Sequence, residues 1–343
     1  MIKNLIKDKK SINSILKHLI FKNNQIIDSC SKLKNEIVNL IEKTTTNSEK
    51  LPVIKFFENL YRGEVDENGL PNNRGYMIYK DTGDFVGDFE KGSKNGKGHM
   101  RYKIENFLDK DLIPLYYNGE WMLDYHHGLG NYTIEDQKSK ATIEKIGEFH
   151  FGNLNGFGRT LLEKDEFSKS KIAGVSENNT KISRIFFGYY LDGSLKNFYF
   201  DLNIDNKFEI NAESGLYFID ENREEVLIHQ FQKIDEYKKI EDTITDQDEK
   251  IPDELLNFYH NYFNHEIKTN KFRELFYKIK RSTINLLYYI EGCTIDETYL
   301  KVFRLNSEII RKLSETRSIK ELEVIDNVLK EIYIQAEKLN KPK

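Results

Sequence analysis

Residues 85–102 read FVGDFEKGSKNGKGHMRY, and residues 117–134 read YNGEWMLDYHHGLGNYTI. Residues 145–162 repeat the pattern as KIGEFHFGNLNGFGRTLL. The three stretches align on one glycine that is followed two positions later by an aromatic residue, and then by an Asn-Gly or His-Gly pair and a further glycine. Aromatic residues that alternate on both sides of a glycine-rich centre are typical of β-hairpins. The pattern therefore predicts a series of similar hairpins.

Two weaker copies flank these three. Residues 61–79 read YRGEVDENGLPNNRGYMIY, with one extra residue before Gly75, and residues 186–203 read FFGYYLDGSLKNFYFDLN. In the last copy Asn197 and Tyr199 replace the later glycines. Nineteen of the chain's 20 glycines lie between Gly63 and Gly215, which is the region of the copies. A single hairpin is marginally stable in water, so we expect the copies to stack into one sheet.

The recurring glycines are interpreted as structural turn glycines. The set is Gly87, Gly96, Gly98, Gly119, Gly128, Gly130, Gly147, Gly156 and Gly158. Gly96, Gly128 and Gly156 follow Asn or His, and we expect them to supply the positive φ that a side chain resists. Gly98, Gly130 and Gly158 are expected to let a neighbouring backbone or ring approach closely.

An aromatic row is predicted along one face of the stacked hairpins. It comprises Phe89, Trp121, Phe149 and Tyr190, with Phe85, Tyr117 and Phe187 beside them. Aromatic side chains offer a large contact area at a low entropy cost, so the row is interpreted as a partner-binding face. The alternative is that the same residues form the core of the array or are covered by the chain's own terminal helices.

These copies resemble the MORN (membrane occupation and recognition nexus) repeat over about residues 61–218. The resemblance implies a single-layer antiparallel sheet of stacked hairpins. It also implies a scaffold that holds partner helices or peptides, dimerises, and sits at membranes or cytoskeletal structures. Some MORN-family proteins join the repeats to an enzyme, but residues 221–343 carry no catalytic signature of that kind.

Residues 1–50 are predicted to form an amphipathic helix. Apolar residues spaced by three and four form a seam, with Asn23 at one seam position; the seam comprises Ile12, Leu16, Leu19, Ile26, Cys30, Leu33, Ile37 and Leu40. Such a seam suits a coiled coil with another chain, which would make a homo-oligomer through residues 1–45. It equally suits a helix packed on its own protein. Ten lysines against five acidic residues also allow contact with an anionic membrane.

Residues 55–220 are assigned to the hairpin array and residues 221–343 to a helical bundle. Residues 226–240, VLIHQFQKIDEYKKI, are interpreted as a helix, and helical spacing resumes from Ile251. Capping boxes at Thr294 and Ser318 open two further helices, which gives an antiparallel bundle of four. The predicted fold class is α+β, with a helix before the sheet and the bundle behind it.

The sequence offers little evidence of chemistry. GSKNGKG at residues 92–98 lacks the spacing of a phosphate loop, and Cys30 and Cys293 form no CxxC pair. No catalytic, cofactor or metal residues are assigned, and no region is basic enough for nucleic acid. The prediction is an intracellular, cytoplasmic, non-enzymatic scaffold for protein–protein interaction, associated with the cytoskeleton or a membrane. The alternatives are a phospholipid-attachment module and an enzyme with an unrecognised site in the C-terminal helices.

Overall fold

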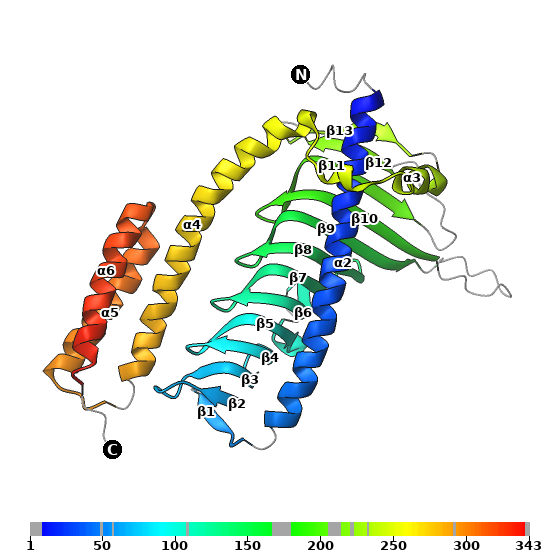
Figure 1. The fold of residues 1–343 in the computed structure, drawn as a ribbon. Coiled ribbons are helices and arrows are strands. Elements are labelled where there is room, and N and C mark those ends of the chain that lie inside the picture. Colours follow the sequence, from blue (N-terminus) through cyan, green and yellow to red (C-terminus); the bar gives the residue numbers. More distant parts are fainter. Residues whose placement is uncertain are drawn as a thin grey trace.

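The computed structural model describes most of the 343 residues. The described ranges are 9–48, 51–56, 58–107, 110–166, 180–204, 214–219, 223–231, 233–290 and 293–339. Residues 1–8, 49 and 50 of the predicted N-terminal helix lie outside these ranges, as does Gly292, the one glycine beyond the region of the copies. Within them the chain forms a long sheet, one helix across the sheet, and a group of helices along one edge (Figure 1).

A single antiparallel sheet of 13 strands forms the body of the chain, and its strand order follows the sequence. Each strand pairs with the next one along the chain, so the sheet is a continuous series of hairpins, as the repeats predicted. The strands are β1 (Ile54–Phe56), β2 (Asn59–Val65), β3 (Pro71–Tyr79), β4 (Gly83–Glu90), β5 (Ser93–Tyr102), β6 (Leu112–Met122), β7 (Tyr125–Asp136), β8 (Ala141–His150), β9 (Asn153–Glu166), β10 (Thr180–Leu191), β11 (Ser194–Ile204), β12 (Gly215–Ile219) and β13 (Glu225–Gln230).

Helix α2 (Lys9–Ser48) lies across one face of this sheet, from β11 near its N-terminal end to β2 near its C-terminal end (Figure 1). The seam predicted from heptad spacing faces the sheet. Its buried members are Ile12, Leu16, Leu19, Asn23, Ile26, Leu33, Ile37 and Leu40. Cys30 is half-buried, and its Sγ donates to Gly130 O at 3.7 Å. The sheet therefore buries the seam within one chain, as the packed-helix alternative required.

The remaining helices follow the last strand. Helix α3 (Ile234–Glu241) and the short 3-10 helix η2 (Asp246–Glu249) lie beside the N-terminal part of α2, where Lys17 Nζ donates to Thr243 O at 2.9 Å. A second short 3-10 helix, η1 (Ile104–Phe107), precedes β6. Helix α4 (Asp253–Ile290) then runs back along one edge of the sheet. Helices α5 (Glu297–Glu315) and α6 (Ile319–Ala336) pack on α4, on its side away from the sheet (Figure 1).

Three predictions for the C-terminal part need correction. Residues 225–230 form strand β13 rather than the start of a helix over 226–240. The bundle has three helices, because the Tyr237 ring of α3 packs under α2 instead, 5.9 Å from the Phe200 ring. Helix α5 is capped by Asp296, whose side chain accepts from Tyr299 N, rather than by Thr294. The capping box of Ser318 and Glu321 at the start of α6 is confirmed.

Three separate apolar cores stabilise the fold. The first lies between the N-terminal half of α2 and strands β9–β12, and includes Leu16 and Phe187. The second lies among α4, α5 and α6, and includes Ile309 and Leu329. The third is aromatic and spans strands β2–β11. Because the second and third cores are distinct, the C-terminal helices have a core of their own and meet the sheet through other contacts.

Candidate interaction site

A row of nine glycines crosses the sheet, because each glycine is the direct cross-strand partner of the next. The row passes through strands β2–β10 and consists of Gly63, Gly75, Gly87, Gly98, Gly119, Gly130, Gly147, Gly158 and Gly188. In β11 the partner of Gly188 is Tyr199, so the row ends where the last copy loses its later glycine.

The glycine row corrects the turn assignment for six of the predicted glycines. Gly87, Gly98, Gly119, Gly130, Gly147 and Gly158 lie inside strands. At five of the six, all but Gly147, the missing side chain makes room for an aromatic ring. A Cβ on Gly98 would overlap the Phe85 ring, and a Cβ on Gly119 or Gly130 would overlap the Tyr117 ring. These rings therefore lie directly over the strands, which confirms the close approach expected at Gly98, Gly130 and Gly158.

The rings above the glycine row form an edge-to-face series, called here the aromatic ladder. Its members, in spatial order, are Tyr61, Phe89, Phe85, Trp121, Tyr117 and Phe149, with successive ring centroids 5.0–5.4 Å apart. Interplanar angles lie between 78° and 88°, the T-shaped geometry that aromatic pairs favour. All six side chains are at most 5% exposed, so the ladder is the core of the array.

The predicted partner-binding face is therefore corrected in two respects. Phe85, Phe89, Tyr117, Trp121, Phe149 and Tyr190 lie together in the aromatic core and offer almost no area to a partner. Phe187 lies on the opposite face, where its ring stacks 5.4 Å from Phe200 under α2. Phe187 directly precedes the row glycine Gly188, whereas Phe85 and Tyr117 stand two residues before theirs. Alternation along a strand sends these positions to opposite faces.

The Asn-Gly and His-Gly pairs lie just after the turns, in the returning strands. Their glycines have positive φ: 104° at Gly96, 59° at Gly128 and 112° at Gly156. The irregular backbone here leaves amide groups that carboxylates satisfy. Asp88 Oδ2 accepts from Lys97 N at 3.0 Å, and Glu120 Oε2 accepts from Leu129 N at 3.0 Å. These acidic residues each directly follow a row glycine, which is a recurring signal that sequence analysis missed.

Four hairpins end in two-residue turns whose central residues both have positive φ, as a type I′ turn requires. The turn pairs are Lys91–Gly92, Leu123–Asp124, Phe151–Gly152 and Asp192–Gly193. We call this set the turn row. Asp124 is the second central residue of its turn, where the other three turns have glycine.

Asparagine side chains connect three of these four turns to the preceding hairpin, whereas Gly152 N of the fourth turn donates to His126 O at 2.9 Å. Asn95 Oδ1 accepts from Leu123 N at 3.4 Å, and Asn155 Oδ1 accepts from Asp192 N at 3.2 Å. Asn72 accepts from Lys91 N in the same way, at 3.3 Å. The asparagines before Gly96 and Gly156, together with Asn72, therefore hold neighbouring repeats together, a role that the sequence pattern did not reveal.

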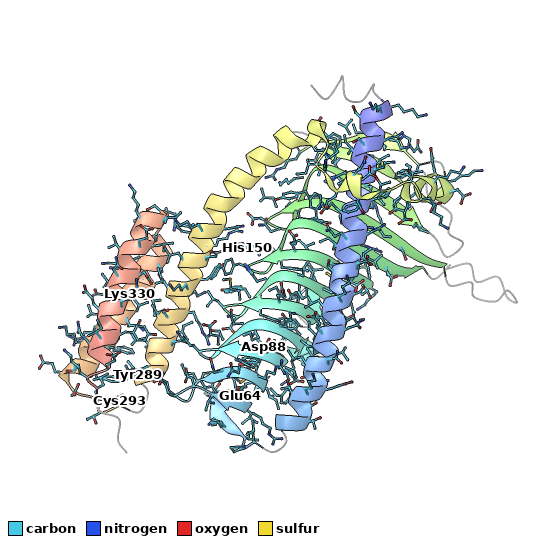
Figure 2. The ribbon with its side chains drawn as sticks, viewed as in Figure 1. Glu64, Asp88, His150, Tyr289, Cys293 and Lys330 are labelled. Atoms are coloured by element: carbon cyan, nitrogen blue, oxygen red, sulfur yellow. The ribbon has the colours of Figure 1, made fainter. Side chains whose placement is uncertain are left out.

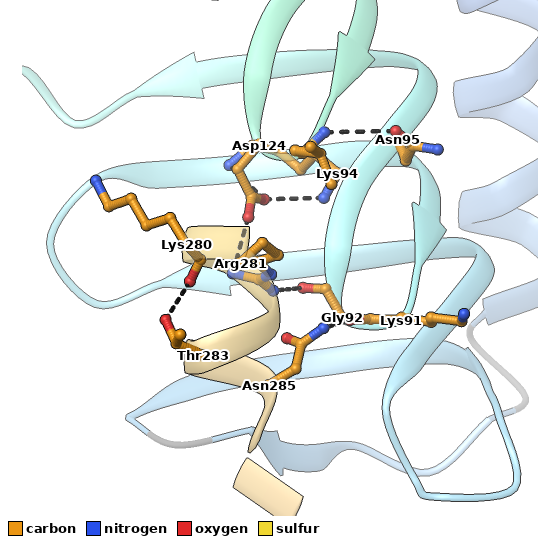
Figure 3. A network of polar contacts seen from close by, with 10 residues as sticks. Lys91, Gly92, Lys94, Asn95, Asp124, Lys280, Arg281, Thr283 and Asn285 are labelled. Atoms are coloured by element: carbon orange, nitrogen blue, oxygen red, sulfur yellow. Dashed lines mark hydrogen bonds and ion pairs between the residues drawn. The ribbon is translucent and has the colours of Figure 1, made fainter. Parts of the chain in front are cut away.

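Helix α4 contacts all four turns of the turn row, and Figure 3 shows its contacts with the first two. Arg281 Nη1 lies 2.9 Å from Asp124 Oδ2, and Arg281 Nη2 donates to Gly92 O at 2.6 Å. Further along, the Tyr277 ring stacks 4.6 Å from the Phe151 ring, and Arg273 forms an ion pair with Asp192. The C-terminal helices thus meet the sheet mainly through polar contacts and one aromatic stack.

Lys94 connects these contacts to the aromatic core. Its Nζ lies 3.5 Å from Asp124 Oδ1 (Figure 3). The same Nζ lies 4.5 Å from the Tyr79 ring centroid and 5.1 Å from that of Trp121. Burial lowers the pKa of Lys94, while the Asp124 carboxylate opposes that shift. Asp124 therefore faces two cations, one from the sheet and one from α4.

An open groove of about 770 Å³ lies between the C-terminal half of α2 and the sheet. Charges of both signs line it, including Glu36 and Lys43 from α2 and Arg74, Asp88, Lys97 and Glu120 from the strands. Lys97 pairs with Glu36, and Arg74 Nε lies 3.8 Å from Asp88 Oδ1. Figure 2 shows Asp88 on the sheet between α2 and α4. We call this space the α2 groove.

The histidines near the aromatic ladder are packing groups. The His126 ring stacks 3.8 Å from the Tyr117 ring, and its Nε2 is 2.8 Å from the Tyr102 hydroxyl. Burial, and then the nearby Lys94 charge, lower the pKa of His126 to about 3. Burial lowers the pKa of His150 to about 4. Within the described part of the chain, no group of three His, Cys, Asp or Glu residues is arranged to hold a metal.

The described helices include none that is both long and apolar enough to cross a membrane. No family model matches the chain. A 72-residue stretch is 35% identical to the "Inactive protein tyrosine kinase pTKL" of Plasmodium berghei (strain Anka). This match covers 21% of the present chain and 5% of that protein, so the chain spans only a small part of this curated relative.

Proposed function

We propose that this chain is a non-enzymatic MORN-repeat scaffold that binds protein partners. The glycine row carries the proposal, because nine consecutive strands keep their glycines in direct cross-strand register. That register is what a hairpin repeat of the MORN kind requires if its aromatic residues are to stack along one face. Repeat arrays of this kind provide extended surfaces, which suit the binding of other proteins.

The α2 groove is the partner surface that we favour over the buried aromatic ladder. It is open, and it lies between α2 and the sheet, with Trp121 as the one ladder residue in its lining. Lys43 is exposed and the Arg74 side chain is 55% exposed, so both can meet a charged segment of another protein. Complementary charges give an interface specificity and speed its association. Among the described residues, no observation favours membrane attachment or catalysis over this function.

A charge-reversal experiment tests the proposal. The double variant Lys43→Glu/Arg74→Glu changes the α2 groove, and Lys32→Glu on the exposed side of α2 is the matched control. Full-length proteins are expressed in the source cells, cross-linked, and their partners quantified by mass spectrometry. We expect at least a fivefold loss of the specific partners with the groove variant and no loss with the control. Equal partner recovery from all three proteins would overturn the α2 groove as the binding surface.

A further inference from the structure

The three-helix bundle has a second groove, far from α2 and from the sheet. It measures about 400 Å³ and lies between α5 and α6. Its lining residues are Ile309, Lys312, Glu315, Thr316, Glu321, Val324, Ile325 and Val328. None of them belongs to α4, which already packs against both helices. The groove is therefore a position beside α5 and α6 that α4 leaves unoccupied.

The floor and the rim of this groove are both apolar. Ile309 and Ile325 form the floor and are buried, at 3% and 8% exposure. Val324 and Val328 stand on the rim, at 64% and 41% exposure. These valines are four residues apart on α6, so they lie one above the other on the same face of the helix. A partner that covered them would remove a continuous apolar strip from water.

The walls of the groove belong to two packed helices, α5 and α6. Two packed helices present ridges and grooves into which the side chains of another helix interdigitate. The four-helix bundle expected from the sequence lacks its fourth member, because α3 packs under α2. A helix seated between α5 and α6 would lie next to the same two helices that α4 contacts, and would restore a four-helix arrangement.

The charges around the groove indicate which helix fits. Glu315, Glu321 and Lys312 line it. Glu315 Oε1 lies 3.4 Å from Arg311 Nη1, and Glu321 Oε2 accepts from Ser318 N at 3.2 Å in the capping box, but both carboxylates are exposed and can also meet a cation of a partner. Glu331 is exposed and follows Val328 by three residues, so it continues the same face of α6. A second copy of this chain is a poor occupant. Antiparallel pairing of two α6 helices about the valines sets Glu321 opposite Glu331, and parallel pairing sets each glutamate opposite its own copy, so both arrangements bring like charges together.

We propose that the α5–α6 groove binds an amphipathic helix of a partner protein, whose apolar face covers Val324 and Val328 and whose flanks carry lysine or arginine. This inference rests on the proposed scaffold function and assigns to it a second surface. The two surfaces are independent, because the α5–α6 groove contains none of the residues that line the α2 groove.

Two designed helical peptides test the proposal on the full-length chain. Both carry the same leucine and alanine apolar face, and their flanks carry only lysine in one and only glutamate in the other. Each is labelled with fluorescein and titrated with the protein at physiological salt, with anisotropy as the signal. The groove variant is Val324→Ser/Val328→Ser. The matched control is Ile334→Ser, because Ile334 is also exposed on α6 but is absent from the groove.

The lysine peptide is expected to bind in the micromolar range, at least tenfold more tightly than the glutamate peptide. The groove variant should weaken that binding at least tenfold, whereas Ile334→Ser and the α2-groove variant Lys43→Glu/Arg74→Glu should leave it unchanged. No binding of the lysine peptide, or equal binding by the groove variant, would overturn this proposal. Neither result would affect the proposal that the α2 groove binds a partner.

Two further experiments test whether a membrane or a second copy of this chain occupies the α5–α6 groove instead. Vesicles of phosphatidylcholine with 30% phosphatidylserine are floated with the wild-type chain and the groove variant, and sedimentation velocity measures their oligomeric state. We expect the substitutions to change neither result. Vesicle binding or dimerisation that is lost in Val324→Ser/Val328→Ser would assign the strip to a membrane or to a second copy, and would overturn the partner-helix assignment.

Discussion

Arg281 Nη1 of helix α4 lies 2.9 Å from Asp124 Oδ2 at a hairpin turn of the sheet. The equivalent residues of the other turns are Gly92, Gly152 and Gly193, so the aspartate is a departure from the repeat. Asp124 adopts a φ of 71°, which a side chain tolerates poorly, although Asp is among the residues most often found there. The carboxylate also lies 3.5 Å from Lys94 Nζ. One irregular residue therefore joins the C-terminal helices to the aromatic core.

Asp124→Gly should destabilise the protein even though it restores the repeat. Glycine relieves the positive φ, but it leaves the largely buried Lys94 and Arg281 side chains without their carboxylate. Losing the charged partner of such groups costs about 1–3 kcal/mol, which exceeds the conformational gain of about 1 kcal/mol. Urea unfolding measures the difference, and Asp124→Asn is the control that tolerates the same φ without the charge. A glycine variant at least as stable as wild type would contradict this account.

Gly98→Ala should destabilise the sheet by overpacking. Its Cβ would overlap the Phe85 ring, and inserting a methyl group into a packed core costs about 1–3 kcal/mol. The matched control is Gly69→Ala, because Gly69 has a positive φ of 78° and nothing within 4 Å of an added Cβ. Chemical denaturation should give a smaller loss, of about 1 kcal/mol, for that strained but uncrowded turn.

Shortening the ring should recover part of the Gly98→Ala loss. Phe85→Leu removes the atoms that the new methyl group meets, so Gly98→Ala/Phe85→Leu should be more stable than the sum of the single changes predicts. Neighbouring residues of this kind show coupling energies of about 0.5–3 kcal/mol. Strictly additive losses would mean that the ring and the glycine do not constrain each other.

Local repetition explains how much of this fold the sequence predicted. Each hairpin is specified within about twenty residues, by aromatic alternation and by glycines that recur at fixed positions. Alternation failed at Phe186-Phe187-Gly188-Tyr189-Tyr190, because aromatic residues occupy both faces there and no polar contrast marks the core side. Residues 226–228, VLI, form a short apolar run, and such a run is equally compatible with a strand and a helix.

The features that could not be predicted from the sequence are contacts between residues far apart in the chain. Apolar residues spaced by three and four have the same pattern whether they face another helix or a sheet. The spacing therefore does not identify the surface against which Leu16 and Leu19 pack. The contact of Arg281 with Asp124 joins residues 157 positions apart, and neither residue belongs to a recognisable motif. The asparagine contacts between hairpins, such as Asn95 to Leu123, depend on a register that only the folded sheet defines.

Leu16→Ala separates the two interpretations of the α2 seam. Leu16 is fully buried in the core between α2 and the sheet, so its truncation should cost about 2–5 kcal/mol. Val38→Ala, at an exposed position of the same helix, should change stability by less than about 0.5 kcal/mol. Thermal unfolding across a hundredfold range of protein concentration provides the decisive comparison. A seam buried within one chain gives a concentration-independent Tm, whereas a coiled-coil dimer would give a Tm that rises with concentration.

Acid should destabilise the sheet through His126. Because its pKa falls from 6.5 in the unfolded chain to about 3 in the folded one, the unfolded chain binds more protons whenever the pH lies below 6.5. The stability linked to this histidine is therefore complete above pH 6.5, and is lost progressively as the pH falls from 6.5 towards 3. At pH 5 the loss attributable to His126 is about 2 kcal/mol. Urea unfolding of wild type and His126→Gln between pH 7.5 and 5 measures this: the variant starts less stable, because it loses the stack on Tyr117, but its stability should fall less steeply with acid. Parallel pH curves for the two proteins would show that His126 already takes up its proton in the folded sheet.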